Sequence, residues 1–291
     1  MSPPSSHAGR LRLRVEQLAP RLGDVEANLD RIGAAQEEAA RDRVDLLVTP
    51  ELALTGYDLR DRTLTLARPL ADLAFPRLAA GPDVVLGAIE RGDDFVPYNV
   101  GVHLRAGAVL HRHRKIYLPT YGMFDEARWF GAGDRVRAYD AGNGWWMGML
   151  VCEDLWHPSL TYLLAMAGVH LVIVQAASVG RGVWEGSATG RFASWAAWEH
   201  LACAAAVAYG IYVVVANRVG VEGAVVFGGG SMVVGPGGVV LARADDLGED
   251  RVTVDLSLAD VAAARNPFAH ARDEDAHLVA RELQRIEEAG R

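Results

Sequence analysis

"MGMLVCEDLW" occupies residues 147–156 and places one of the two cysteines of the chain at the polar end of an apolar run. The run is typical of a buried strand, and Cys152 follows it, directly before two acidic residues. A cysteine that only fills a core is expected inside such a run. A nucleophilic cysteine is expected where a strand of an α/β fold ends and a turn lifts the sulfur into a cleft. Cys152 is therefore the candidate nucleophile, whereas Cys203, among alanines of a predicted helix, is expected to be structural.

The segments on either side of this stretch alternate between strand-like and helix-like patterns. Apolar or alternating runs predict strands at residues 11–15, 44–51, 82–90, 98–107, 108–118, 145–152, 169–177, 211–220, 224–244 and 251–258. Asp24 is a predicted helix N-cap and Gly210 a predicted helix stop, and the helical patterns cover residues 24–42, 158–168, 187–210 and 273–288. The alternation predicts one α/β domain with a mixed sheet or with two packed sheets.

Composition and charge narrow the classes of function. The chain has 291 residues and a formal net charge of -8 at pH 7, which argues against general binding to nucleic acid or to an anionic membrane surface. Residues 1–10 are polar and lack the apolar core of a signal peptide, so we expect a disordered leader. The apolar runs are too short to cross a bilayer. Two cysteines make no disulfide framework, which favours a cytoplasmic location.

Three further charged side chains stand at or near predicted strand ends. Glu51 follows Pro50 after one strand, Lys115 ends "HRHRK", and Glu126 lies between aromatic residues in "YGMFDEARWF". Taken singly, a solvated cap, a solvated strand face and an aromatic loop packed on the core would explain them. A thiol must lose its proton to attack, however, and that requires a base or a cation from elsewhere in the chain.

Taken together, three motifs resemble those of the nitrilase superfamily of carbon–nitrogen hydrolases. They are "PELALTGY" at residues 50–57, "HRKIYLPTYGMFDEARWF" at 113–130 and "VCEDLW" at 151–156. The motifs look most like the glutaminase domain of glutamine-dependent NAD synthetases, while "NRVG" and "FGGGSMVVGPGG" match the wider superfamily. The resemblance implies a four-layer α-β-β-α sandwich in a single domain over residues 11–258. Residues 259–291 would then form a C-terminal extension that contributes to an oligomer contact or remains a solvated helix.

The resemblance also implies a Glu-Lys-Cys triad made of Glu51, Lys115 and Cys152. Glu51 would act as general base and then general acid, and the sulfur of Cys152 would form a thioester with the substrate. Lys115 would stabilise the tetrahedral oxyanion together with the backbone N–H of Glu153. Glu126 corresponds to the second glutamate of the family and would orient the triad and the substrate.

The substrate pocket follows from the same resemblance. Tyr121 and Phe124 match aromatic positions that line the glutamine pocket of the synthetase domain, and Trp156 is expected to form another wall. The synthetase domain has a "SASP"-like segment where this chain has "AASVG", so that only Ser178 is retained. Glutamine is therefore one candidate beside other carboxamides, N-carbamoyl amines and nitriles.

Two arginines, Arg181 and Arg191, are candidate clamps for a substrate carboxylate. No metal and no cofactor are expected, because the histidines of "HRHRK" have no carboxylate or cysteine at ligand spacing nearby. The glycines of "GGGSMVVGPGG" lead into a strand and not into a helix N-terminus that could bind phosphate.

The partners implied are a small amide substrate and a second copy of the chain, in a homodimer or a larger assembly. No "SGGxDS"-like phosphate loop occurs in the sequence, so the chain is not expected to make NAD alone. The sequence leaves three alternatives: a free-standing amidase, a glutaminase subunit that feeds ammonia to a separate ligase, and a non-catalytic binding protein with the hydrolase fold.

Overall fold

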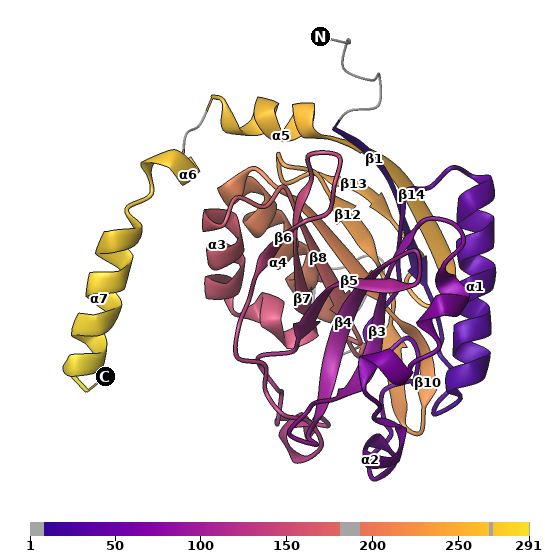
Figure 1. Ribbon diagram of the computed structural model, residues 1–291. Coiled ribbons are helices and arrows are strands. Elements are labelled where there is room, and N and C mark those ends of the chain that lie inside the picture. Colours follow the sequence, from indigo (N-terminus) through magenta and orange to yellow (C-terminus); the bar gives the residue numbers. More distant parts are fainter. Residues whose placement is uncertain (1–8, 181–192, 268–269, 291) are drawn as a thin grey trace.

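The computed structural model describes residues 9–180, 193–267 and 270–290, which form two mixed sheets with helices on both outer sides (Figure 1). In this part of the chain the first six-stranded sheet has the order β14 (Asp250–Ser257), β1 (Arg10–Gln17), β2 (Leu46–Val48), β3 (Asp83–Arg91), β4 (Pro97–Arg105), β5 (Ala108–Arg114). The second has the order β13 (Val240–Arg243), β12 (Met232–Val234), β9 (Tyr212–Asn217), β8 (Leu171–Ala176), β7 (Trp146–Val151), β6 (Ala138–Asp140).

Strand direction explains why the ends of three strands matter. β1, β2 and β3 are parallel, while β4 is antiparallel to both β3 and β5. β5 therefore runs in the same direction as β2, and the two strands end at the same edge of the first sheet. In the second sheet β7, β8 and β9 are parallel, so the segments that follow them also share one edge.

Three apolar layers hold the sandwich together. Leu13, Val85, Met149 and Ile173 belong to the cluster between the two sheets. A second cluster joins the outer face of the first sheet to α1 (Val25–Arg41). A third joins the outer face of the second sheet to α3 (Pro158–Met166) and α4 (Ala193–Tyr209). Burial on both faces explains why the strands read as continuous apolar runs. The predicted four-layer α-β-β-α sandwich is confirmed.

Several local predictions are also confirmed. The side chain of Asp24 accepts a hydrogen bond from the N–H of Ala27 at the start of α1. Gly210 follows the last residue of α4 with a φ of +58°, a conformation that glycine adopts without a side-chain clash. The predicted start of that helix at residues 187–192 lies outside the described residues.

Other local predictions were incomplete. The segment at residues 224–244 was expected to hold two strands, but it holds β11 (Val225–Gly228), β12 and β13, and β11 pairs with β10 (Val219–Glu222) in a separate hairpin. The short helix α2 (Arg62–Leu66) and β6 were not predicted, because runs of three to five residues carry too little periodicity to recognise.

The C-terminal residues form α5 (Leu258–Arg265), α6 (His270–Asp273) and α7 (Ala276–Glu288). Figure 1 shows α7 standing away from the two sheets, and none of its residues is buried. The predicted charged helix near residues 273–288 is therefore present. The predicted leader at residues 1–10 lies almost wholly outside the described residues, and Arg10 already belongs to β1.

Candidate active site

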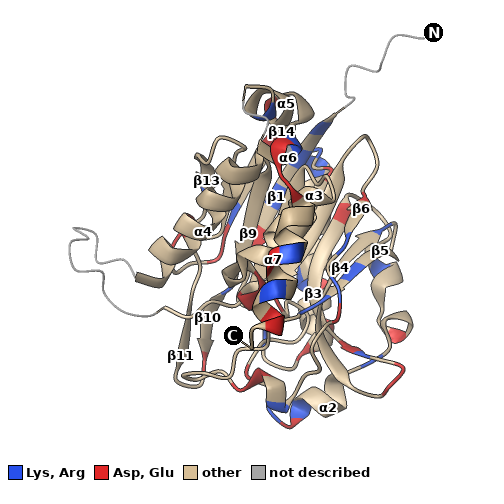
Figure 2. Ribbon diagram, turned by 90° about the vertical axis from the view of Figure 1, so that its left-hand side faces the viewer, with Lys and Arg blue, Asp and Glu red and all other residues tan. Residues whose placement is uncertain are grey.

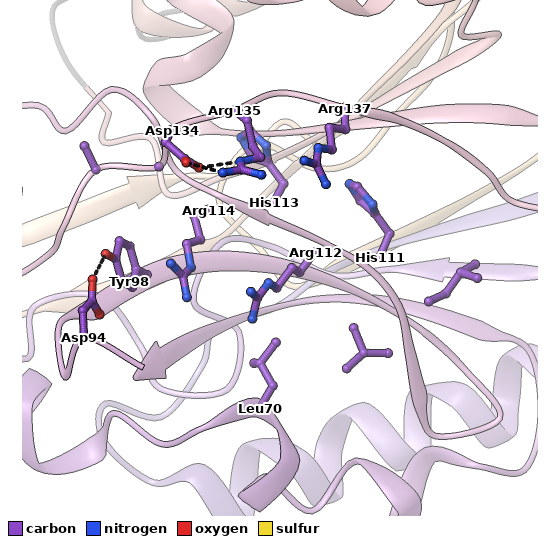
Figure 3. Close-up of a pocket in the computed structure, with 14 residues that line it drawn as sticks. Leu70, Asp94, Tyr98, His111, Arg112, His113, Arg114, Asp134, Arg135 and Arg137 are labelled. Carbon is purple, nitrogen blue, oxygen red and sulfur yellow. Dashed lines mark hydrogen bonds and ion pairs between the residues drawn. The ribbon is translucent and has the colours of Figure 1, made fainter. Parts of the chain in front are cut away.

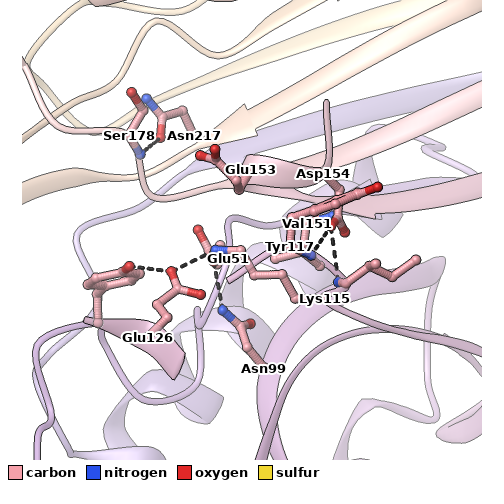
Figure 4. A network of polar contacts seen from close by, with 12 residues as sticks. Glu51, Asn99, Lys115, Tyr117, Glu126, Val151, Glu153, Asp154, Ser178 and Asn217 are labelled. Carbon is pink, nitrogen blue, oxygen red and sulfur yellow. Dashed lines mark hydrogen bonds and ion pairs between the residues drawn. The ribbon is translucent and has the colours of Figure 1, made fainter. Parts of the chain in front are cut away.

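The candidate side chains come from segments that follow β2, β5 and β7. Glu51 lies in the turn after β2, Lys115 directly follows β5, and Cys152 directly follows β7. β2 and β5 belong to one sheet and β7 to the other, so the site lies between the two sheets (Figure 4). Gln175 of β8 crosses between the sheets and donates a hydrogen bond of 2.7 Å to the carbonyl oxygen of Thr49. This bond fixes the backbone just before Glu51.

Lys115 binds two carboxylates away from water. Its Nζ donates to Oε1 of Glu51 at 2.8 Å and to Oε1 of Glu126 at 2.7 Å. Lys115 and Glu51 have no exposed side-chain surface, and the side chain of Glu126 is 4% exposed. Nδ2 of Asn99 donates to the same oxygen of Glu51 at 2.7 Å, and the hydroxyl of Tyr57 donates to Glu126. Buried charges of this kind need both a partner and hydrogen bonds.

Burial and neighbouring charges shift the pKa values in this cluster. Burial acts to lower the pKa of Lys115, but the charges of Glu126 and Glu51 outweigh it and raise that pKa well above its ordinary value. Burial raises the pKa of Glu126 to about 7, against the opposing charge of Lys115. Burial and the charge of Glu51 hold the pKa of Cys152 well above its ordinary value, although Lys115 acts to lower it. Cys152 is therefore a thiol at neutral pH and needs a base to become a nucleophile.

The backbone at Cys152 has an uncommon conformation. Its φ is +50°, in the left-handed region that residues with a side chain rarely adopt. Cys152 begins the 3₁₀ turn Cys152–Trp156, it is 7% exposed, and a hydrogen bond from the backbone of Ala177 reaches it. A strained residue at a sharp turn after a strand is typical of a nucleophile that a fold holds in place.

The predicted substrate-binding residues form two groups. In the first, the hydroxyl of Tyr121 donates to Oε2 of Glu153 at 2.7 Å, and the ring of Phe124 lies 5.8 Å from that of Tyr121 and 6.0 Å from that of Tyr57. The hydroxyl of Tyr57 binds Glu126, so these contacts connect the first group to the buried cluster.

The second group lies against α4. The ring of Trp156 is 5.9 Å from that of Trp198, whose Nε1 donates to Oγ of Ser178 at 2.8 Å. The N–H of Ser178 donates to the side chain of Asn217. Arg181 and Arg191 lie outside the described residues.

Sequence reasoning missed Tyr57, Asn99 and Asp154. Tyr57 ends the quoted "PELALTGY" and could have been singled out there. Asn99 is a polar residue within an apolar strand, which is a weak signal by itself. Asp154 stands in "VCEDLW", but nothing in the sequence shows that its side chain points back into the protein, where it is fully buried.

The largest described pocket, about 790 Å³, lies elsewhere, along β5 and residues 132–137 (Figure 3). Its arginines have carboxylate partners: Arg112 and Arg114 bind Glu90, and Arg135 binds Asp134 at 2.7 Å. A smaller pocket of about 280 Å³ is lined by Tyr57 and Glu126 and so reaches the buried cluster. Size alone therefore does not identify the site.

Two searches of the described ranges complete the survey. No group of three or more His, Cys, Asp or Glu side chains there has an arrangement that could hold a metal ion. None of the helices in the described ranges has both the length and the apolar content needed to cross a membrane.

The sandwich, with a cysteine, a lysine and two glutamates at strand ends, defines a class of hydrolase. The sequence pattern of the family described as carbon–nitrogen hydrolase matches residues 12–266, and the chain belongs to this family, which is the nitrilase superfamily. The protein is accordingly a hydrolase of carbon–nitrogen bonds.

Known relatives narrow the neighbourhood. The chain is 35% identical over 260 residues to the glutamine-dependent NAD(+) synthetase of Thermotoga maritima, a match that covers 86% of this chain and 42% of that protein. The corresponding synthetase of Aquifex aeolicus is 30% identical over 263 residues, covering 88% of this chain and 44% of the relative. The chain thus spans less than half the length of these relatives.

Solved structures agree with this placement. An amidase of the nitrilase superfamily from Nesterenkonia AN1 superposes with a TM-score of 0.75 at 28% identity, over 96% of this chain and 98% of that one. A glutamine-dependent NAD+ synthetase from Acinetobacter baumannii superposes with a TM-score of 0.77 at 25% identity, over 87% of this chain and 46% of that one. A mutant of the Nesterenkonia amidase shows covalent addition of the acetamide moiety of fluoroacetamide at its active-site cysteine.

Proposed function

We propose that the protein hydrolyses a small carboxamide, of the glutamine type, to a carboxylic acid and ammonia through a thioester on Cys152. The observation that carries the proposal is the buried Lys115 ammonium, which binds Glu51 and Glu126 beside a thiol that is influenced by the charges of all three. An acid, an ammonium and a thiol in one buried cluster can supply a base, oxyanion stabilisation and a nucleophile together.

In the first half-reaction Glu51 takes the thiol proton as the sulfur attacks the amide carbon. The oxyanion that forms is stabilised by the Lys115 ammonium and by the backbone N–H of Glu153. The C–N bond then breaks, Glu51 returns its proton to the leaving nitrogen, and ammonia departs from the thioester. Because the pKa of Cys152 is raised, proton removal and attack are expected to occur together.

In the second half-reaction Glu51 takes a proton from water while the water oxygen attacks the thioester carbon. The C–S bond breaks, the acid is released, and the proton held by Glu51 returns to the sulfur of Cys152. Glu126 stays bound to Lys115 throughout and keeps the ammonium directed at the reacting atoms.

The substrate class is inferred from the first group of pocket residues. The Glu153 carboxylate, with Tyr121 bound to it, can pair with the ammonium group of an amino-acid amide, while the Phe124 ring packs on its aliphatic part. Trp156 and Ser178 form the further wall in this proposal. The printed names of the synthetase relatives support glutamine as the first compound to test.

The test measures released ammonia over a panel with glutamine, asparagine, N-carbamoyl amines, simple amides and nitriles. Protein quenched during turnover should carry an acyl adduct on Cys152, and Cys152→Ala should release no ammonia. Glu153→Gln should raise KM for glutamine and leave KM for butyramide, which has no amino group, unchanged. An active Cys152→Ala variant would refute the proposal.

A second candidate is a glutaminase subunit that supplies ammonia to a separate ligase. It is favoured by the synthetase relatives, because the matched segment is only 42% of the Thermotoga protein. Glutamine hydrolysis that rises when an ammonia-dependent ligase is added, together with co-purification of the two, would support it. If the whole panel releases no ammonia and one compound binds tightly, a non-catalytic binding role would replace both candidates.

We also propose that residues 259–291 contribute to a homo-oligomer. Val279, Leu283 and Ile286 recur on one side of α7 at the spacing of an apolar helix face, yet no residue of α7 is buried. Light scattering of the protein with and without residues 270–291 measures this, since loss of the helix should lower the mass of the assembly. An unchanged mass would contradict the proposed role.

A further inference from the structure

The carboxylate of Asp154 is completely buried and accepts four hydrogen bonds. Oδ1 accepts from the N–H groups of Ile116 and Tyr117, each at 3.0 Å, and Oδ2 accepts from the N–H of Val151 at 3.0 Å and from Nε2 of His113 at 2.8 Å. Asp154 and His113 are 0% and 3% exposed. Figure 4 shows Asp154 between the segments that carry Val151 and Tyr117.

The positions of these donors in the sequence show what the carboxylate connects. Ile116 and Tyr117 directly follow Lys115, and His113 precedes it by two residues. Val151 directly precedes Cys152, and Asp154 itself follows Cys152 by two residues. One side chain therefore binds the backbone on both sides of the lysine and lies in the same short turn as the cysteine.

These two segments belong to different sheets. Lys115 follows β5 of the first sheet and Cys152 follows β7 of the second. Apolar packing between sheets is not directional and leaves small shifts of one sheet against the other inexpensive. Hydrogen bonds to a carboxylate are directional and short, so they fix the position of the ammonium relative to the sulfur.

We propose that Asp154 is a positioning residue that sets the distance between the sulfur of Cys152 and the ammonium of Lys115. This inference rests on the proposed function, because it matters only if both groups act in one reaction. Asp154 does not touch the substrate in this proposal and transfers no proton. It acts by holding two catalytic segments in register across the sheets.

Asp154→Asn tests the proposal with a side chain of nearly the same shape. Whichever way the amide turns, its NH₂ group faces at least one backbone N–H that the carboxylate accepted. We expect kcat per folded molecule to fall by about 100-fold, the loss typical of a displacement of about 1 Å in reacting groups. KM should change less than threefold, and the rate of Cys152 alkylation by iodoacetamide should fall with kcat.

A matched pair at His113 keeps the test decisive if the asparagine variant does not fold. His113→Gln retains a nitrogen donor near the position of Nε2 and should keep most of the activity. His113→Leu removes that donor, leaves three backbone donors and should lower kcat by about 10-fold with KM nearly unchanged. Rescue by glutamine and not by leucine separates the hydrogen bond from simple packing.

Gln36→Leu serves as the control for general destabilisation. Gln36 is buried on α1, and its Nε2 donates to the carbonyl oxygens of Leu78 and Pro82 at 3.0 and 2.7 Å. Its loss should lower the melting temperature and leave kcat unchanged. If Asp154→Asn and His113→Leu also keep the kcat of the wild type, Asp154 has no positioning role. An active Cys152→Ala variant would instead refute the proposed function, so the two failures can be told apart.

Discussion

The groove along β5 and the buried cluster around Lys115 are adjacent along the chain but differ in how they use charge. In the groove Arg135 and Asp134 form an ion pair with side chains that are 59% and 71% exposed. In the cluster Lys115 and Glu51 are fully buried. Water screens the first pair, whereas the second must be stabilised by fixed hydrogen bonds. The comparison shows that the number of charges in a pocket indicates less about its chemistry than their burial.

The largest expected effect comes from Lys115→Met, which leaves Glu51 and Glu126 buried without their cation. We expect a loss of about 3–5 kcal/mol in the free energy of unfolding, measured in urea. Ammonia release should fall by about 1000-fold or more in the protein that remains folded. If stability and activity both stay close to the wild type, the two carboxylates do not depend on Lys115.

Glu126→Gln tests the raised pKa of Glu126 through the pH dependence of stability. The pKa is about 7 in the folded protein and 4.5 is its ordinary value, so the unfolded chain loses this proton first as the pH rises. Wild-type stability should therefore decrease between about pH 4.5 and 7, by at most about 3 kcal/mol, relative to the variant. Urea unfolding of both proteins at several pH values measures the difference, and parallel curves would show that Glu126 ionises normally.

Tyr57→Phe probes the rim of the cluster with a smaller change. The variant loses the hydroxyl that donates to Glu126 and keeps the ring that packs on Phe124 and Phe227. A hydrogen bond to a buried charge predicts a loss of about 2 kcal/mol in the free energy of unfolding, with a decrease in kcat. Calorimetry and ammonia release measure the two effects, and a variant equal to the wild type would place Glu126 outside the influence of Tyr57.

The smallest effect is expected for Arg135→Met in the groove. Because Arg135 and its partner Asp134 are both exposed, its removal should change the free energy of unfolding by about 0.5 kcal/mol or less and leave ammonia release unchanged. The same measurements as for Lys115→Met apply. A large loss at Arg135 would remove the contrast between the two regions.

The sequence predicted the fold well because its strands are buried on both faces and carry long apolar runs. It also predicted which side chains follow β2, β5 and β7, and the structure brings Glu51, Lys115 and Glu126 into direct contact. Their catalytic roles remain predictions. The contacts of Asn99 and Asp154 could not be predicted, because each depends on how strands from distant parts of the chain are aligned. Short elements such as α2 and β6 carried no usable periodicity.

The positive φ of Cys152 has a consequence for how the chain can vary. Every amino acid with a β-carbon at this position must adopt the same unfavourable dihedral angle, at a cost of about 1–2 kcal/mol. Only glycine would relieve it, and glycine has no nucleophile to offer. Mutational drift toward a more stable protein at residue 152 therefore leads directly to an inert one.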